Sequence, residues 1–253
     1  ASHDQPGYPG TTLLSRDVVL IGPFDGAEPE NPMNRHPDNR AEFGSNALAD
    51  SNVLQWLNSD QTDWFHPQTP WDTPPESKYI RNGARGYRDL PGYLTTLPEP
   101  VKNALLETDV PIHMLGDNGQ PGVGYVHTKV FLPSRAEMGL GDDYGIPEGS
   151  PLPLLLDVRR KSAFLTEAAA AWYAGPWQSQ FPMRAGGNWR YWLRSPHLRY
   201  GYLVRYVADM GGLSFTKANY EIVGVRPMMN VRDDLQVEDT AFSGNVYYLK
   251  EEP

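Results

Sequence analysis

The chain has 253 residues, a formal net charge of −9 and no cysteine. Its basic residues form no stripe of Lys and Arg, which makes nucleic acid and anionic membrane poor partners. The lack of cysteine excludes disulfides, thiolate metal sites and thiol nucleophiles. No apolar run is long enough for membrane insertion. Aromatic residues make up 11% of the chain and no break in composition occurs, so we expect one folded domain over residues 1–253.

The first part of the chain predicts one strand, two short helices and long loops. Residues 16–21 form a β-branched run that ends at Gly22 and Pro23, which is typical of a strand. Residues 50–58 place apolar side chains on one helical face after a capping-type polar residue. A second helix is expected to begin near Pro98. Residues 25–47 and 59–92 are rich in Pro, Asp and Gly and predict ordered, irregular loops.

The middle of the chain mixes strands and short helices. Strands are expected around residues 110–114 and 125–132. Ser134 and Glu137 have the spacing of a capping box and predict one helical turn before Gly139. Residues 159–174 are the best remaining helix candidate.

The last third of the chain is the most strand-like. Short runs of aromatic and β-branched residues occur at 189–195, 200–208, 212–216, 221–231 and 245–249. Gly and Pro separate these runs, which predicts an antiparallel meander. Short helices early and an antiparallel sheet late indicate an α+β fold class with long ordered loops, and residues 232–253 are interpreted as a C-terminal extension.

Two motifs link the chain to a known family. Residues 191–196 (YWLRSP) and 224–230 (GVRPMMN) resemble the paired signatures of an uncharacterised domain family that is widespread in bacteriophages, prophages and gut bacteria. Further matches follow the same order, at residues 24–25, 43–46, 51–59, 91–94 and 129–134. The resemblance covers residues 8–231.

The resemblance implies a C-type-lectin-like domain, related to the fold of formylglycine-generating enzymes and phage tropism proteins. Members of this family typically begin with one or two further strands, so we expect this chain to lack its first strands. Either the chain is a fragment of a longer virion protein, or a partner chain supplies the missing edge. The absence of an initiator Met fits a processed or partial chain.

The sequence predicts no enzyme activity. A formylglycine-generating enzyme needs cysteine thiols, which this chain lacks, and the six histidines form no close i, i+4 pair that would favour an iron site. Ser195 lies two residues before His197 but lacks the Gly-x-Ser-x-Gly elbow, so we interpret it as a turn residue. We therefore expect no catalytic residue and no catalytic metal.

Calcium is the one cofactor that the sequence leaves open. Asp142, Asp143 and Glu148 lie among glycines and carry hard oxygen ligands. Their spacing does not fit an EF-hand, and the alternative is a solvated acidic loop.

Structural roles are expected for Trp192, Arg194, Arg205 and Arg226. Trp192 is interpreted as a core residue. Arg194 and Arg226 are expected to pair with a structural carboxylate or with loop carbonyls, the alternative being a carboxylate ligand. Arg205 alternates with apolar strand neighbours, so we expect it to point inward, where it would need such partners.

Two surfaces carry candidate contact residues. Polar and aromatic side chains between the two signature motifs are typical of ligand surfaces: Tyr200, Tyr202, Lys217, Asn219 and Tyr220. The loop of residues 59–92 offers Trp64 and Trp71, with His66 and Tyr87, as exposed aromatics that could stack on a sugar or bury into a partner.

Two functions therefore remain as hypotheses. In the first, the chain is a non-enzymatic, adhesin-like module of a phage tail or fibre that binds a host-surface glycan or protein. In the second, it is a structural virion protein, such as a capsid decoration or fibre subunit, that packs against other virion proteins or copies of itself. Both place the chain at the virion surface, outside the cell.

Overall fold

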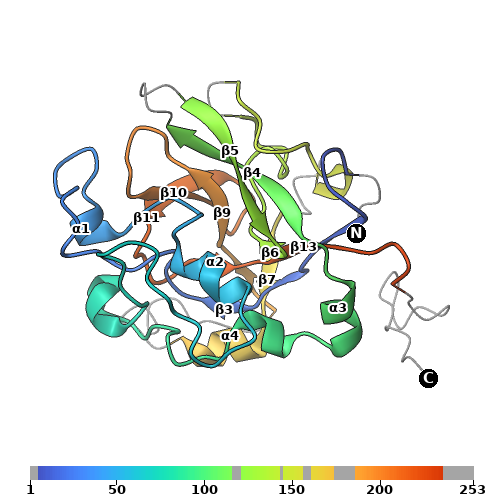
Figure 1. Ribbon diagram of the computed structural model, residues 1–253, viewed down its shortest axis with the longest axis horizontal. Helices are drawn as coiled ribbons and strands as arrows, with labels where there is room; N and C mark the ends of the chain where they lie inside the picture. Colours follow the sequence, from blue (N-terminus) through green and yellow to red (C-terminus); the bar gives the residue numbers. More distant parts are fainter. Residues whose placement is uncertain (1–4, 116–120, 143–144, 156–160, 174–185, 236–253) are drawn as a thin grey trace.

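The computed structural model describes residues 5–115, 121–142, 145–155, 161–173 and 186–235, which form short helices and several small, mostly antiparallel sheets (Figure 1). The helices are α1 (Arg40–Phe43), α2 (Asn52–Leu57), α3 (Glu99–Ala104) and α4 (Glu167–Trp172). Single 3₁₀ turns are η1 (Ser77–Tyr79), η2 (Arg81–Gly83), η3 (Tyr93–Thr96) and η4 (Pro153–Leu155). This arrangement confirms a mixed α+β fold.

The strands are distributed over the whole described chain. The early strands are β1 (Thr11–Leu14), β2 (Asp17–Val18) and β3 (Leu20–Ile21). The middle strands are β4 (Thr108–Leu115), β5 (Pro121–Thr128), β6 (Val130–Phe131) and β7 (Ala163–Leu165). The late strands are β8 (Asn188–Trp189), β9 (Tyr191–Pro196), β10 (Leu203–Val207), β11 (Leu213–Lys217), β12 (Gly224–Val225) and β13 (Met228–Val231).

Within the described residues the largest sheet has five strands, in the order β11-β10-β9-β12-β3. Strands β9, β10 and β11 form an antiparallel meander, as predicted, and β12 runs parallel to β9. Two three-stranded sheets, β1-β13-β6 and β2-β7-β8, and the β4–β5 hairpin complete the strand pairing. The first strand and one of the last therefore share a sheet, because β1 pairs with β13.

Local signals account for the helix starts. Ser51 caps α2 by accepting a hydrogen bond from the backbone N–H of Leu54, and Thr166 caps α4 in the same way from Ala169. The capping box is also confirmed. The backbone N–H of Ser134 donates to Glu137 Oε2 over 2.8 Å, and that of Glu137 donates to Ser134 Oγ over 3.0 Å.

Three predicted elements differ in the structure. The predicted strand at residues 221–231 is split at Arg226 and Pro227 into β12 and β13, which belong to different sheets. The predicted strand at 16–21 is likewise divided into β2 and β3. The predicted helix at 159–174 was wrong in its first part, because β7 pairs there with β2 and β8 before α4 begins. The predicted strand at 245–249 lies outside the described residues.

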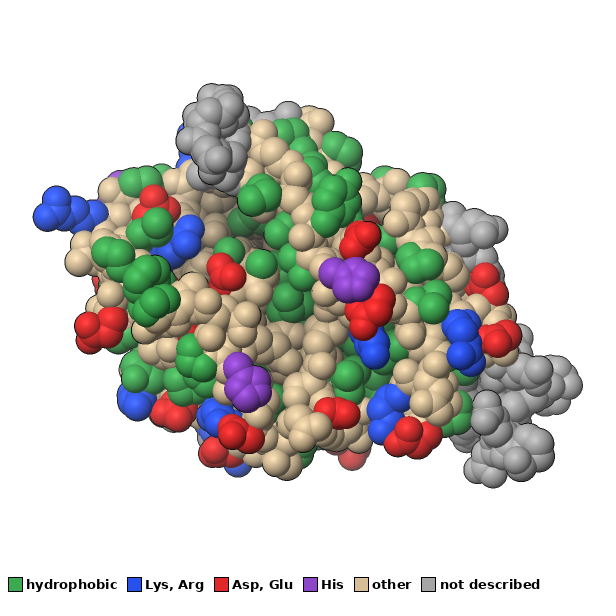
Figure 2. Space-filling view, viewed as in Figure 1, with side chains coloured by type: hydrophobic (Ala, Val, Ile, Leu, Met, Phe, Trp, Pro, Cys, Tyr) green, Lys and Arg blue, Asp and Glu red, His purple; other side chains and the backbone are tan. Residues whose placement is uncertain are grey.

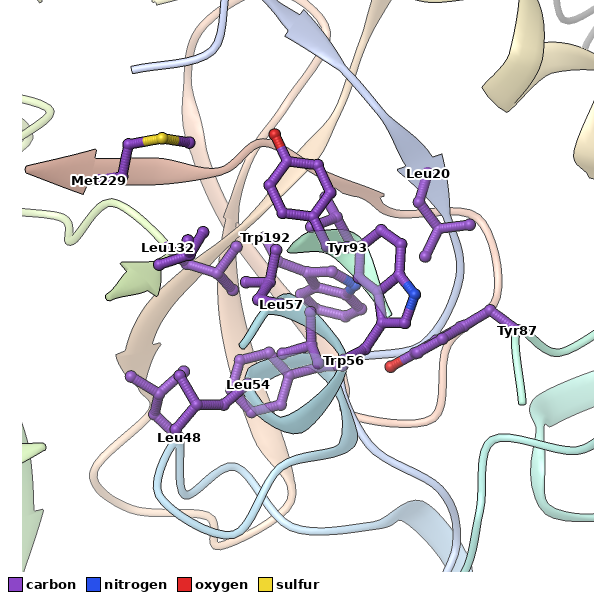
Figure 3. Close-up of a cluster of buried hydrophobic side chains, with 14 of the residues drawn as sticks. Leu20, Leu48, Leu54, Trp56, Leu57, Tyr87, Tyr93, Leu132, Trp192 and Met229 are labelled. Carbon is purple, nitrogen blue, oxygen red and sulfur yellow. The ribbon is translucent and has the colours of Figure 1, made fainter. Parts of the chain in front are cut away.

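The core is built around the indole of Trp192. This side chain is fully buried and donates from Nε1 to the carbonyl of Gly22 over 2.9 Å. Phe24 meets it edge-on, with ring centroids 5.9 Å apart. Helix α2 adds Trp56 and Leu57 to the same cluster, which Figure 3 shows together with Trp192.

Within the described residues, no helix has the length and apolar character that crossing a bilayer requires.

Candidate functional site

The most prominent charged group is a buried ion pair between Arg194 and Glu137. Both side chains are fully buried, and the contact is bidentate, with Nη1 to Oε2 at 2.6 Å and Nη2 to Oε1 at 2.8 Å. The other donors of Arg194 meet the hydroxyl of Tyr8 and the carbonyls of Pro111, Leu132 and Glu148. Because protein atoms already occupy these donors, Arg194 has a structural role and does not face a ligand.

Ser195 and Glu148 form a second buried polar cluster with His113. The hydroxyl of Ser195 donates to Glu148 Oε2, and Glu148 Oε1 accepts from the backbone N–H of His113 over 2.8 Å. The His113 ring lies with Nδ1 3.6 Å from Glu148 Oε2 and Nε2 against the carbonyl of Ile146. Ser195 is bonded to the carboxylate rather than to the imidazole, so this is no nucleophile–base pair.

The structure corrects the interpretation of Ser195 and places Glu148 outside the solvated acidic loop considered for it. Ser195 is not a turn residue but part of β9, where its hydroxyl accepts from the backbone N–H of Arg135. Glu148 is 1% exposed, and its Oε1 accepts the hydrogen bond from the backbone N–H of His113 in β4. Asp142 is exposed and Asp143 lies outside the described residues. The described residues include no group of three or more His, Asp or Glu arranged to hold a metal ion.

Six rings gather on the face formed by α1, the β9–β10 turn and β11. We call this set the aromatic patch: His36, Phe43, His197, Tyr200, Tyr202 and Phe215. Neighbouring ring centroids lie between 4.9 and 6.1 Å apart. Figure 1 shows α1 beside β10 and β11 at the left of the molecule. Phe215 is 48% exposed and His36 is exposed, so the patch is open to a partner.

Two asparagines hold the aromatic patch together. Asn46 donates from Nδ2 to the carbonyls of Tyr200 and Leu203, at 2.8 and 3.0 Å, which fixes the β9–β10 turn. Asn219 is also fixed in position. Its backbone N–H donates to the carbonyl of Phe43, and its Nδ2 donates to the carbonyl of Glu42. These bonds position α1 against the end of β11.

A pocket of about 350 Å³ opens on one side of the patch. Its walls come from the α1 region, the tip of β4 and the β9–β10 turn, and they mix apolar with charged side chains. The charged and imidazole groups are Asp38, Arg40, Asp50, His113, His197 and Arg199. Figure 2 shows the surface hollowed beside the β4–β5 hairpin, on the side that faces α1.

A second pocket, of about 340 Å³, lies on the other side of Phe43. It is lined by α1, η1, η2 and the end of β11, and it contains the cations Lys78, Arg81 and Lys217. We call it the basic pocket. Burial and the nearby Arg81 guanidinium lower the pKa of Lys217. A positively charged pocket stands out in a chain of net charge −9.

The structure brings most of the predicted contact residues between the signature motifs together. Tyr200 and Tyr202 belong to the aromatic patch, and Lys217 and Asn219 line the basic pocket. Tyr220 is adjacent, with the guanidinium of Arg81 5.7 Å from its ring centroid. Asn219 is 5% exposed, so it contributes to the pocket wall rather than to an open surface.

The second predicted surface is largely buried. Trp64 is 2% exposed, donates from Nε1 to the carbonyl of Leu90 and stacks on Tyr87, with ring centroids 5.6 Å apart. Tyr87 is itself fully buried, Trp71 is half-buried and His66 is exposed. The loop packs on its own aromatic side chains, so Trp64 is a core residue and not a contact residue.

The two remaining arginines that were predicted to be structural, Arg205 and Arg226, differ in how deeply they are buried. Arg226 is 5% exposed and donates to the carbonyl of Ser15 and the hydroxyl of Tyr191. Arg205 is half-buried rather than fully buried as the prediction expected. The pairing of β10 with β9 shifts register between Val204 and Tyr206, which breaks the strict alternation on which the prediction relied.

Sequence reasoning missed several residues of this face. These residues lie far along the chain from β11, in α1, η1, η2 and the loop before α1, and no local sequence pattern marks them: Phe43, Lys78, Arg81 and His36. The one available signal was the family motif at residues 43–46, which includes Phe43.

Comparison with known proteins places the chain in a family without assigning an activity. A search of curated proteins and a search of solved structures each gave no match. A family model matches residues 9–233, nearly all of the described chain, and includes both signature motifs. The chain therefore belongs to the family described as Domain of unknown function (DUF6273).

Proposed function

We propose that the chain is a non-enzymatic surface module of a phage particle, with a C-type-lectin-like fold, that binds a host-surface glycan or protein. The observation that carries the proposal is the aromatic patch, because six rings are gathered on one face between two pockets. Aromatic rings with polar neighbours make good contact surfaces for sugars and proteins. The sequence resemblance to a phage and prophage family supports the virion location.

The buried polar clusters support a binding role over a catalytic one. Arg194, Glu137, Glu148 and Ser195 are the side chain types that catalysis uses, yet each is at most 1% exposed and bonded to other protein groups. Their bonds hold β4, β9 and the turn after Ser134 together. The accessible groups of the face are instead rings and single charges, which suit recognition.

The test replaces two rings of the aromatic patch. Tyr202→Ala with Phe215→Ala should reduce attachment of the domain to host cells at least tenfold while the melting temperature changes little, because both rings are partly exposed. Tyr125→Ala is the matched control, since Tyr125 is 68% exposed on the β4–β5 hairpin. Unchanged attachment by the double variant would contradict the proposal.

A structural virion role is the second candidate, and the β4–β5 hairpin favours it. The hairpin carries Met114, Val123 and Tyr125 at 48%, 38% and 68% exposure. Exposed apolar side chains on a two-stranded element are typical of a surface that packs against a neighbour. In this case Tyr125→Ala would reduce incorporation into particles, and the aromatic-patch variant would not.

A further inference from the structure

We infer that the basic pocket binds the acidic group of an anionic saccharide, with Lys217 and Arg81 holding the anion and Asn219 accepting a hydrogen bond from a sugar hydroxyl. The inference rests on the proposed function, because it names the class of ligand that the same face would bind. Its residues come from two segments, η2 and the end of β11, which converge only in the folded chain.

The first support is a pair of cations that form no ion pair with the described residues. Among the described residues, neither the ammonium of Lys217 nor the guanidinium of Arg81 forms a hydrogen bond or an ion pair. Lys217 contacts the ring of Phe43, with Nζ 4.0 Å from the centroid. The third cation, Lys78, already pairs with Glu76 over 3.3 Å. Two unpaired cations in one pocket repel each other, and a bound anion removes that repulsion.

The carboxylate at the pocket does not neutralise these charges. Glu42 is the single acidic residue among the described residues that line the pocket. It accepts a hydrogen bond from the side chain of Asn39 over 2.9 Å. With Lys78 paired to Glu76, the two cations Lys217 and Arg81 face Glu42 alone, which leaves a net positive pocket and favours an anion as the ligand.

The second support is an unsatisfied acceptor. Asn219 is 5% exposed, and its Oδ1 has no hydrogen-bond partner in the described structure. The amide orientation is fixed, because Nδ2 donates to the carbonyl of Glu42 over 3.0 Å. A buried acceptor of this kind requires a donor. A sulfate ion supplies no donor near neutral pH, whereas a sugar brings hydroxyl donors next to its acidic group.

The third support is the continuity between the pocket and the aromatic patch. Phe43 lines the basic pocket and also packs against Tyr202, with ring centroids 5.0 Å apart. A saccharide whose acidic residue occupies the pocket would therefore extend over the rings of the patch. Carbohydrate faces stack well on aromatic rings, so the two features suit one ligand.

The experiment measures binding of the purified domain to an array of neutral, sialylated, uronic-acid and sulfated saccharides. Lys217→Gln and Arg81→Gln should each weaken binding to the acidic sugars about tenfold or more, since each removes a charge-assisted hydrogen bond. Raising the salt concentration should weaken the wild type in the same way. Lys102→Gln is the control, because Lys102 pairs with Glu99 on α3, outside the pocket.

The array shows whether the bound acidic group is a carboxylate or a sulfate. It also tests the inference independently of the proposed function. Preference for acidic sugars that both pocket variants lose supports the inference. Equal binding to neutral and acidic sugars, or full binding by both variants at unchanged melting temperature, overturns it. The absence of binding to any sugar on the array also overturns the inference. The proposed function is then tested separately, by whether the aromatic-patch variant loses attachment to cells.

Discussion

Replacing Arg194 with methionine tests how much of the fold depends on one buried ion pair. Methionine fills much of the same space without a charge or a donor. The five N–H groups of Arg194 make six hydrogen-bond contacts, to the carboxylate of Glu137, the hydroxyl of Tyr8 and three backbone carbonyls. These partners lie on β4, on the segment after β6 and on the first described residues, so the substitution loosens several elements at once.

The expected loss follows from what remains after the substitution. Each buried carbonyl that loses its donor costs about 1 kcal/mol or more. The carboxylate of Glu137 loses its counter-charge but keeps the N–H of Ser134 and the hydroxyl of Tyr8 as donors. Breaking a buried pair from one side typically costs about 3–5 kcal/mol, and we expect Arg194→Met to fall in this range. A domain is stable by only about 5–15 kcal/mol, so the loss is a large part of the total.

Urea unfolding followed by tryptophan fluorescence measures this loss. Arg16→Met is the matched control, because Arg16 pairs with Asp17 at the surface with its side chain 75% exposed, and it should change stability by less than about 0.5 kcal/mol. A double variant, Arg194→Met with Glu137→Met, should lose less than the sum of the single variants, by about 1–3 kcal/mol.

Two outcomes would refute the reasoning. A loss below about 1 kcal/mol for Arg194→Met would mean that the six bonds contribute little beyond those that water provides in the unfolded chain. Strict additivity in the double variant would mean that Arg194 and Glu137 act independently, despite their bidentate contact.

Three further predictions concern single residues. Burial raises the pKa of Glu28 to about 7, so the folded chain holds a proton that the unfolded chain releases, and stability falls as the pH rises towards and through about 7. Glu28→Gln should reduce this fall, to which the buried Asp25 also contributes, and should be more stable than the wild type by about 1–2 kcal/mol near pH ~8.5 in thermal unfolding. Gly44 has a φ of 77°, and a Cβ there would overlap the backbone oxygen of Gly26. Gly44→Ala should therefore lower the free energy of unfolding by about 2–4 kcal/mol in urea, and an unchanged unfolding midpoint would contradict this. Asn46→Ala removes the donor to the carbonyls of Tyr200 and Leu203 and should lower stability by about 1–3 kcal/mol, with faster hydrogen exchange confined to the β9–β10 turn.

Features that depend on neighbours along the chain could be predicted from the sequence. The capping box of Ser134 and Glu137 involves residues three apart, so its hydrogen bonds follow from local geometry. The α2 helix and the β9-β10-β11 meander likewise follow from the periodicity of short segments. The α+β class rests on these local signals.

Features that depend on distant segments could not be predicted. Burial of Trp64 results from Tyr87 and Leu90, which fold back on it from the far end of a long loop. The register shift in β10 that leaves Arg205 half-buried depends on its partner strand and leaves no mark in the sequence of β10. The basic pocket joins η2 to the end of β11, and no local pattern connects Arg81 with Lys217.

The pairing of β1 with β13 determines how the domain responds to mechanical force. Thr11 at the start of β1 faces Val231 at the end of β13, so the chain enters and leaves this sheet at the same end of the strand pair. A pulling force applied through these two points acts across the strands and breaks the inter-strand hydrogen bonds one after another, instead of loading them all together. Tension applied through Thr11 and Val231 would therefore separate β1 from β13 progressively from that end.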